Sequence, residues 1–370
     1  LYNTLFSPLV LAASLETLGE TARGATADHI RRVLRSSSQK EAPSAASYPQ
    51  ALRSAVDSNL TAFTLRAASA LFTKQVAALD QNFLKRARSG GVGRIGLNHV
   101  ALGSGGKKPD SATFHTWAQG ATGTDNVAQL SKEPQAQSGA LVLANALRIK
   151  GLWEKGFGES SEDLRTFLGV KYTRVPLMHR SGIYRHYEDV ANMVQVLELG
   201  LRGGEASMLI LLPFLVEKLE RLEKLITLEQ LQSWHSKLTD TSLALSLPRV
   251  TLRSSLNLQA ALTTLGLVDV WTQGKADFSG LGGAKGQMHL GGVLHWASLE
   301  FSPDSGHKKE AKDGEEATVE EEEEEDVDVS PKMFYADHSF VVMVMDKASG
   351  ALVLMGAMDV AEGRSLHDEL

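Results

Sequence analysis

The chain has 370 residues, of which 43% are hydrophobic and 22% charged, and its net charge is −6. These are the proportions of a globular protein, and they exclude a disordered polyampholyte, a collagen and a disulfide-stapled mini-protein. The sequence contains no Cys, which excludes cysteine proteases, zinc fingers and thiol oxidoreductases. No apolar run approaches the roughly 18 residues that span a bilayer, so we expect no membrane insertion.

Helical patterns dominate the first third of the chain. Ser7 and Pro8 precede an apolar-periodic stretch at residues 9–18 that stops at Gly19, an arrangement typical of a helix. The segments that follow are predicted as a helix at 25–34, a β-rich segment at 61–72, a helix at 80–88, a glycine-rich loop at 90–106 and a helix at 111–120.

Strands dominate the rest. Residues 243–250 alternate with period two, as a half-buried strand does. Strands are predicted at 141–149, 193–199, 206–212, 243–250, 293–301, 340–345 and 351–355, and helices at 215–225, 228–238 and 255–265. No linker composition divides the chain, so we expect one α+β domain at residues 1–360 and a tail at 361–370.

Acidic charge is concentrated in one segment. Residues 304–328 hold 13 acidic and three basic side chains, a charge of −10, which leaves +4 for the remainder. Because the segment falls between two predicted strands, we interpret residues 302–330 as a loop insertion. Three roles remain open for it: a solvated spacer, weak Ca²⁺ binding without the spacing of an EF-hand, and electrostatic contact with basic clients.

Both ends of the chain bear on its location. The last four residues, His367, Asp368, Glu369 and Leu370, form a signal that a retrieval receptor of the endoplasmic reticulum reads. The first residues lack a Met and a basic region, so we treat the chain as truncated at its start, and the retrieval signal implies a signal peptide that this sequence lacks. Asn59 starts an Asn-Leu-Thr glycosylation sequon. We therefore expect a glycoprotein of the endoplasmic reticulum lumen.

Along residues 3–360 the sequence resembles the serpin family. The matching motifs stand in family order: Phe6-Ser7-Pro8, Leu18-Gly19, Arg23-Gly24-Ala25-Thr26, Asn145-Ala146-Leu147, Lys150-Gly151-Leu152-Trp153, Leu247-Pro248, Leu265-Gly266, Asp277-Phe278-Ser279-Gly280, Val293-Leu294-His295, Asp337-His338-Ser339-Phe340 and Met355-Gly356. The resemblance implies the serpin fold, an α+β fold with three β-sheets, about nine helices and an exposed reactive-centre loop. From the position of the first matching motif we expect the first helix of the family to be missing.

Within the family the chain is similar to the colligins, collagen-binding chaperones of the endoplasmic reticulum. The shared features are the C-terminal signal, the sequence Phe-Tyr-Ala-Asp-His at 334–338, Met178-His179-Arg180 with Gly182 and Tyr184, and residues 219–225. This resemblance implies a monomer whose partner is the procollagen triple helix, with no cofactor and no nucleic acid. A lumenal chaperone with other or broader clients is the alternative.

Protease inhibition is disfavoured by the composition of the reactive-centre loop. An inhibitory serpin inserts this loop into its main sheet, which buries alternate side chains. Here Pro303 cannot donate to a strand ladder, and the Lys and Asp side chains that follow are costly to bury without partners. The segment then runs into six consecutive Glu at 320–325, which repel one another.

The colligin pattern implies a set of collagen-contacting residues. In colligins an Asp captures an Arg of collagen, and the matching residues here are Asp337, Tyr335 two before it, and Met333 in place of a Leu. Strand alternation places the three on one face, and an Arg–carboxylate pair is directional. Further contacts are implied at Arg165, Leu168 and Ser246. Asp337 as a cap, Tyr335 as a packed ring and Arg165 as a surface cation remain open alternatives.

Colligins are held to release collagen when histidines become charged in acidic compartments. Only His338, His179 and His295 remain as candidate switch residues here, and each also reads as a structural His. Other positions of the family set carry other residues: Leu152, Gly158, Glu159, Phe214 and Leu215. Release by pH is therefore an open question at this point.

Enzyme activity is not expected. The sequence has no nucleophile elbow, no zinc-protease motif and no phosphate-binding loop, and its histidines are scattered.

Overall fold

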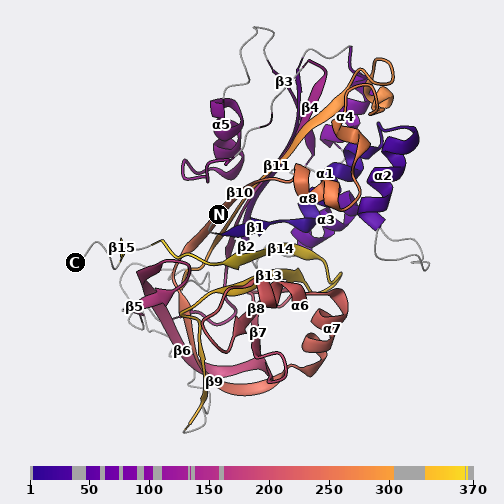
Figure 1. Cartoon of the computed structure of the whole chain (residues 1–370). Coiled ribbons are helices and arrows are strands. Elements are labelled where there is room, and N and C mark those ends of the chain that lie inside the picture. The colour runs from indigo at the N-terminus through magenta and orange to yellow at the C-terminus, as the bar shows by residue number, and fades with distance from the viewer. Residues whose placement is uncertain are drawn as a thin grey trace, which may run out of the picture.

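A computed structural model describes residues 3–35, 47–58, 63–74, 78–89, 96–102, 111–131, 134, 138–157, 162–303, 330–362 and 364–365. Within these residues eight α-helices and fifteen strands form one α+β arrangement, with two hydrogen-bonded sheets (Figure 1). Several predicted features lie outside the described residues: the glycosylation sequon at Asn59, most of the loop insertion at 302–330, and the four residues of the retrieval signal.

The described helices flank the sheets, and α1 (Pro8–Gly19) is the most enclosed of them, with no exposed residue along its length. The first begins where the sequence indicates, because the Ser7 hydroxyl accepts the Val10 N–H at 3.1 Å and Pro8 occupies the first turn. The eight helices are α1 (Pro8–Gly19), α2 (Gly24–Arg35), α3 (Tyr48–Ser58), α4 (Gln81–Ser89), α5 (Ser111–Thr122), α6 (Glu220–Leu225), α7 (Leu228–Lys237) and α8 (Gln259–Thr264). None of these described helices is long and apolar enough to cross a membrane.

The smaller sheet has five strands in the order β10-β11-β4-β2-β3. These are β10 (Thr251–Asn257), β11 (His289–Glu300), β4 (Ala140–Gly151), β2 (Phe63–Lys74) and β3 (Leu97–Leu102). β4 and β11 are parallel and pair from His289 opposite Ala140 to Glu300 opposite Lys150. Both are buried over nearly their whole length, as central parallel strands are.

The larger sheet has ten strands. Eight follow the order β1-β14-β13-β8-β7-β6-β9-β12, and β5 and β15 also pair with β6. They are β1 (Thr4–Phe6), β14 (Leu352–Met358), β13 (Phe340–Asp346), β8 (Ala206–Pro213), β7 (Val194–Gly200), β6 (Tyr172–Asp189), β9 (Thr239–Pro248), β12 (Lys332–Tyr335), β5 (Glu162–Leu168) and β15 (Arg364–Ser365). The resemblance implied three sheets. Two of them are continuous here, because β6 pairs with β5 near its start, with β9 along its middle and with β7 at its end.

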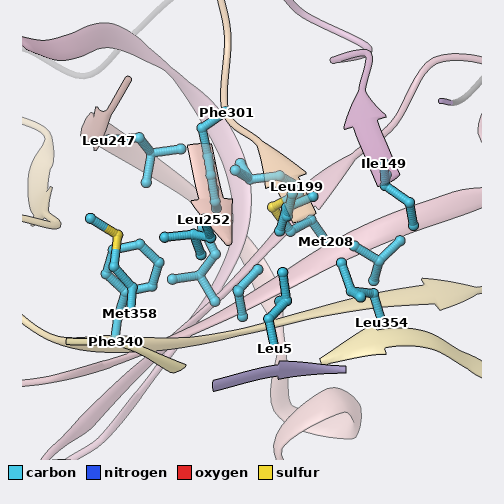
Figure 2. Close-up of a cluster of buried hydrophobic side chains, with 14 of the residues drawn as sticks. Leu5, Ile149, Leu199, Met208, Leu247, Leu252, Phe301, Phe340, Leu354 and Met358 are labelled. Carbon is cyan, nitrogen blue, oxygen red and sulfur yellow. The ribbon is translucent and has the colours of Figure 1, made fainter. Parts of the chain in front are cut away.

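The main core lies between the two sheets. Figure 2 shows its centre, where Leu252 and Phe301 approach Leu5, Phe340 and Met358. Phe334 and Ala336 belong to the same cluster and are fully buried. Burying a Phe side chain stabilises a fold by about 1.5–3 kcal/mol, so these two residues hold β12 firmly against the body.

Two predicted helices differ from the structure. The helix predicted at 215–225 begins only at Glu220, and residues 214–219 form an irregular connection after β8. The helix predicted at 255–265 is reduced to α8, because residues up to Asn257 belong to β10 and pair with β11.

Candidate functional site

Four strands bring the predicted binding residues together. β12 lies beside β9, β9 beside β6, and β6 beside β5, in the lower left part of Figure 1. In the register of these strands Tyr335 is opposite Ser246, and Ser246 is opposite His179. Opposed residues of neighbouring strands share a face, so these side chains lie side by side. We call this surface, together with the adjoining Asp337 and the outward residues of β5, the four-strand face.

Alternation along β12 decides which residues are presented. Phe334 and Ala336 are buried in the core, while Met333 is 66% exposed and Tyr335 is half-buried. Successive residues of a strand point to opposite faces, so the burial of Phe334 and Ala336 forces the other two outward. The Ala336 N–H donates to the Ser246 carbonyl at 3.0 Å, which continues the pairing to the point where Asp337 leaves the sheet.

Asp337 and His338 form a tight pair at this exit. His338 Nδ1 is 2.8 Å from Asp337 Oδ1, and His338 Nε2 is 2.7 Å from the Pro213 carbonyl oxygen. Both partners are acceptors, so only the charged imidazolium donates to both. Burial of the ring lowers the pKa of His338, but the bonds to Asp337 and Pro213 outweigh it, and the pKa is raised above its usual value. Asp337 remains 24% exposed.

The last residue of β5 is tied to this pair. The Leu168 N–H donates to the Asp337 carbonyl at 2.7 Å, and Leu168 forms an isolated parallel bridge with His338. Leu168 is itself half-buried. The structure therefore places Leu168 beside Asp337.

A second chain of hydrogen bonds crosses the face from β5 to β9. Arg165 Nη2 is 2.5 Å from Asp163 Oδ2, and Asp163 Oδ1 is 2.6 Å from His179 Nε2. His179 Nδ1 is 2.7 Å from the Ser246 hydroxyl. Arg165 is thus not an isolated surface cation, since it is paired with a carboxylate that the sequence analysis did not single out.

The charges of this chain support one another. The hydrogen bond from Arg165, and then that from His179, hold the pKa of Asp163 below its usual value. The same bond to Asp163 raises the pKa of Arg165. Burial raises the pKa of the Tyr335 phenol, which stays neutral and presents a ring and a hydroxyl. The face consequently carries a fixed ion pair at Asp163 and Arg165, with Asp337 as a separate carboxylate.

His295 lies elsewhere. It is fully buried on β11, where its Nε2 accepts the Ser7 N–H at 2.9 Å. Protonation would place a second hydrogen where that N–H already points, and burial lowers the pKa of His295 to about 4. The prediction of His295 as a switch near pH 6 is therefore corrected: this residue has a structural role, and His338 and His179 remain as candidates.

Two residues of the site escaped the sequence analysis. Asp163 is one, and Pro213, whose carbonyl binds His338, is the other. The only signals were the Asp-x-Arg spacing on β5 and a Pro at the end of an apolar strand, and neither indicates a partner across a sheet. In the described part of the chain, no group of three or more His, Asp and Glu side chains is arranged to hold a metal ion.

Comparison with known proteins identifies the protein family to which this fold and site belong. The family model described as serpin (serine protease inhibitor) matches residues 2–359, and the chain belongs to the serpin family. It is similar to Serpin H1 of Bos taurus, with 30% identity over all of this chain and 84% of that protein. Serpin H1 of Gallus gallus is also 30% identical, over all of this chain and 87% of the relative.

Solved structures agree on the fold. Uncleaved ovalbumin superposes with a TM-score of 0.78 at 22% identity, covering 97% of this chain and 93% of ovalbumin. Native protease nexin-1 with heparin gives a TM-score of 0.77 at 22% identity, covering 97% and 92%. The serpin fold predicted from the sequence is confirmed.

Proposed function

We propose that this protein is a non-inhibitory serpin chaperone of the endoplasmic reticulum lumen that binds the folded procollagen triple helix. Asp337 captures an Arg of the triple helix, and the observation that carries this is its partly exposed carboxylate beside Met333 and Tyr335 on one open face. The similarity to Serpin H1 and the C-terminal retrieval sequence support the same assignment.

The face suits a rod that presents only side chains. A collagen triple helix buries every Gly at its axis and displays the X and Y side chains outward. Met333 offers a flexible apolar contact, and Tyr335 offers a ring with a polar end. Asp337 Oδ1 is already bound to His338. The ligand guanidinium is therefore assigned to Oδ2. The contact is then monodentate, and its strength depends on the charge of His338.

The start of the reactive-centre loop supports the absence of inhibition. Trp153 Nε1 donates to the Ser302 carbonyl at 2.5 Å, and the Phe157 N–H donates to the Pro303 carbonyl at 3.0 Å. Insertion of the loop from this point would have to break these two bonds. Pro303, which lacks an N–H, would then enter the new strand.

Release of the ligand follows from the contact between Asp337 and His338, just after β12. When His338 is charged it neutralises Asp337, and the carboxylate attracts a ligand Arg less strongly. The raised pKa of His338 places this change above the usual histidine value of about 6.5, so acidification from neutral pH completes the charging. Acidification therefore weakens the capture of the ligand.

The test is a titration against a triple-helical peptide with a Gly-Xaa-Arg triplet, at pH near 7.4 and near 6. Asp337→Asn should weaken binding at least about tenfold, because it removes the charge that holds the guanidinium. Asp240→Asn is the matched control, since Asp240 is exposed on the same sheet at the opposite end of β9. If wild-type protein does not bind the peptide, or if both variants bind alike, the collagen function is wrong and a chaperone with other clients takes its place.

A further inference from the structure

Asp163 is the centre of the hydrogen-bonded chain on the four-strand face. It contacts two side chains at once, Arg165 through Oδ2 at 2.5 Å and His179 through Oδ1 at 2.6 Å. The three side chains are partly open to solvent, with Arg165 the most exposed at 55%. Ser246 forms the inner end of the chain and is only 7% exposed. This row of hydrogen bonds thus links the exposed guanidinium of Arg165 to the nearly buried hydroxyl of Ser246.

The partners of His179 determine where its hydrogen sits. An ionised carboxylate only accepts hydrogen bonds, so the Nε2 that faces Asp163 carries the hydrogen. In the neutral ring Nδ1 is then bare, and it accepts the Ser246 hydroxyl at 2.7 Å. The Ser246 hydrogen is therefore directed at His179, and the two lone pairs of the oxygen can accept from another donor that reaches it.

We propose that Asp163 is a positioning residue that makes Ser246 a hydrogen-bond acceptor and holds Arg165 on the four-strand face. This deepens the proposed function and rests on it, because it specifies the ligand: beside the captured Arg, the triple helix contributes a small hydrogen-bond donor, such as a side-chain hydroxyl, to Ser246. The low exposure of Ser246 restricts that donor to a small group. Arg165 keeps further N–H groups for carbonyl oxygens of the ligand.

A single substitution reverses this arrangement. In Asp163→Asn, the side chain offers one oxygen and one NH₂ group. Arg165 has only donors, so it takes the oxygen, and the NH₂ group faces His179 Nε2. Nε2 must then accept, the hydrogen moves to Nδ1, and Nδ1–H donates to the Ser246 oxygen. The Ser246 hydrogen is released to point at the ligand, so the site changes from an acceptor to a donor.

The decisive measurement is made on the ligand-free full chain. Imidazole ¹H–¹⁵N correlations of His179, recorded at about pH 8, distinguish a ring nitrogen that carries hydrogen from a bare one. We expect Nε2–H in wild-type protein and in the control Asp240→Asn, and Nδ1–H in Asp163→Asn. A merely structural role for Asp163 would leave the tautomer unchanged. Nδ1–H in the wild type, or no change in Asp163→Asn, overturns the proposal.

The second measurement tests the ligand. Triple-helical peptides with a Gly-Xaa-Arg triplet are compared in pairs that carry Thr or Val at one flanking position at a time. At one such position the wild-type protein should prefer Thr by about fivefold, the contribution of one hydrogen bond. Ser246→Ala should abolish the preference, and Asp163→Asn should abolish or reverse it. If every pair binds equally while Asp337→Asn still abolishes binding, the donor assignment is wrong and the collagen function stands. If no peptide binds, the collagen function fails, and the tautomer alone decides the role of Asp163.

Discussion

Replacing His338 with Gln should remove most of the pH dependence of the Asp337 site. The His338 ring lies between two acceptors, with Nδ1 at 2.8 Å from Asp337 Oδ1 and Nε2 at 2.7 Å from the Pro213 oxygen. A charged ring satisfies both, whereas a neutral ring satisfies one and leaves the other facing a bare nitrogen. A Gln amide keeps a donor for one acceptor but has no proton to gain or lose in this range.

The sign and size of the effect on stability follow from the raised pKa of His338. A raised pKa means that the stabilisation is complete below the unfolded value of about 6.5 and is lost as pH rises through the higher value of the folded protein. The change amounts to one hydrogen bond to a charged group less the cost of burying that charge, or about 1–2 kcal/mol. The difference in free energy of unfolding between wild-type protein and His338→Gln should therefore be larger at pH near 6 than at pH near 8.5. The increase should equal this amount.

Ligand affinity should change in the opposite direction. The charged ring that stabilises the fold also neutralises Asp337, so at pH near 6 His338→Gln should bind the Gly-Xaa-Arg peptide about tenfold more tightly than wild-type protein, with little difference at pH near 8.5. Urea denaturation and peptide titration at both pH values measure the two effects. His235→Gln is the matched control, because His235 is exposed on α7. The reasoning is refuted if His338→Gln keeps the pH dependence of the wild type in both measurements.

Two further predictions separate the core face of β12 from its outward face. Phe334→Ala should lower the free energy of unfolding by about 3–5 kcal/mol, seen as a lower urea midpoint with an unchanged slope, because Phe334 is fully buried. Met333→Ala, one position earlier, should change the free energy of unfolding by no more than about 0.5 kcal/mol, because Met333 is largely exposed. The same variant should weaken peptide binding severalfold. Equal midpoint shifts for the two variants would contradict this assignment of faces.

Much of the fold could be read from the sequence where a local signal and the tertiary structure agree. The Ser7 cap and Gly19 bound α1 correctly. The apolar run at 141–149 is β4 (Ala140–Gly151), because a central parallel strand is apolar on both sides. The hairpin at 340–355 is β13 and β14, which pair from Phe340 opposite Met358 onward.

No pattern in the sequence predicted β6, the longest strand in the described structure. Over its 18 residues it pairs with four different strands, β5, β7, β9 and β15, and its burial pattern changes along its length. Pro176, Gly182 and several Arg interrupt any simple alternation. Period-two patterns are clear only where one face stays buried throughout, so a strand that passes from one environment to another has no such signature.

The same limit explains which site residues could be predicted. Met333, Tyr335 and Asp337 lie two residues apart along one segment, so alternation alone relates them. Asp163 meets His179 only because β5 pairs with β6 in the register that sets Asp163 opposite Leu177. That register is a tertiary property. It depends on two strands that the sequence analysis did not predict.

The net charge of the four-strand face is set by a few ionisable side chains. Asp163 and Arg165 neutralise each other, and both pKa shifts reinforce that pairing. Among the residues of this face, the net charge therefore depends on Asp337 and on the protonation of its neighbours. With His338 neutral the face carries one negative charge at the place where a ligand Arg would sit, and with His338 charged it carries none. Because Phe334 and Ala336 fix the backbone on which Asp337 stands, this change in charge needs no movement of the strand. Under the proposed function, acidification then weakens the capture of a ligand Arg through a change in electrostatics at Asp337, on a strand that the core holds in place.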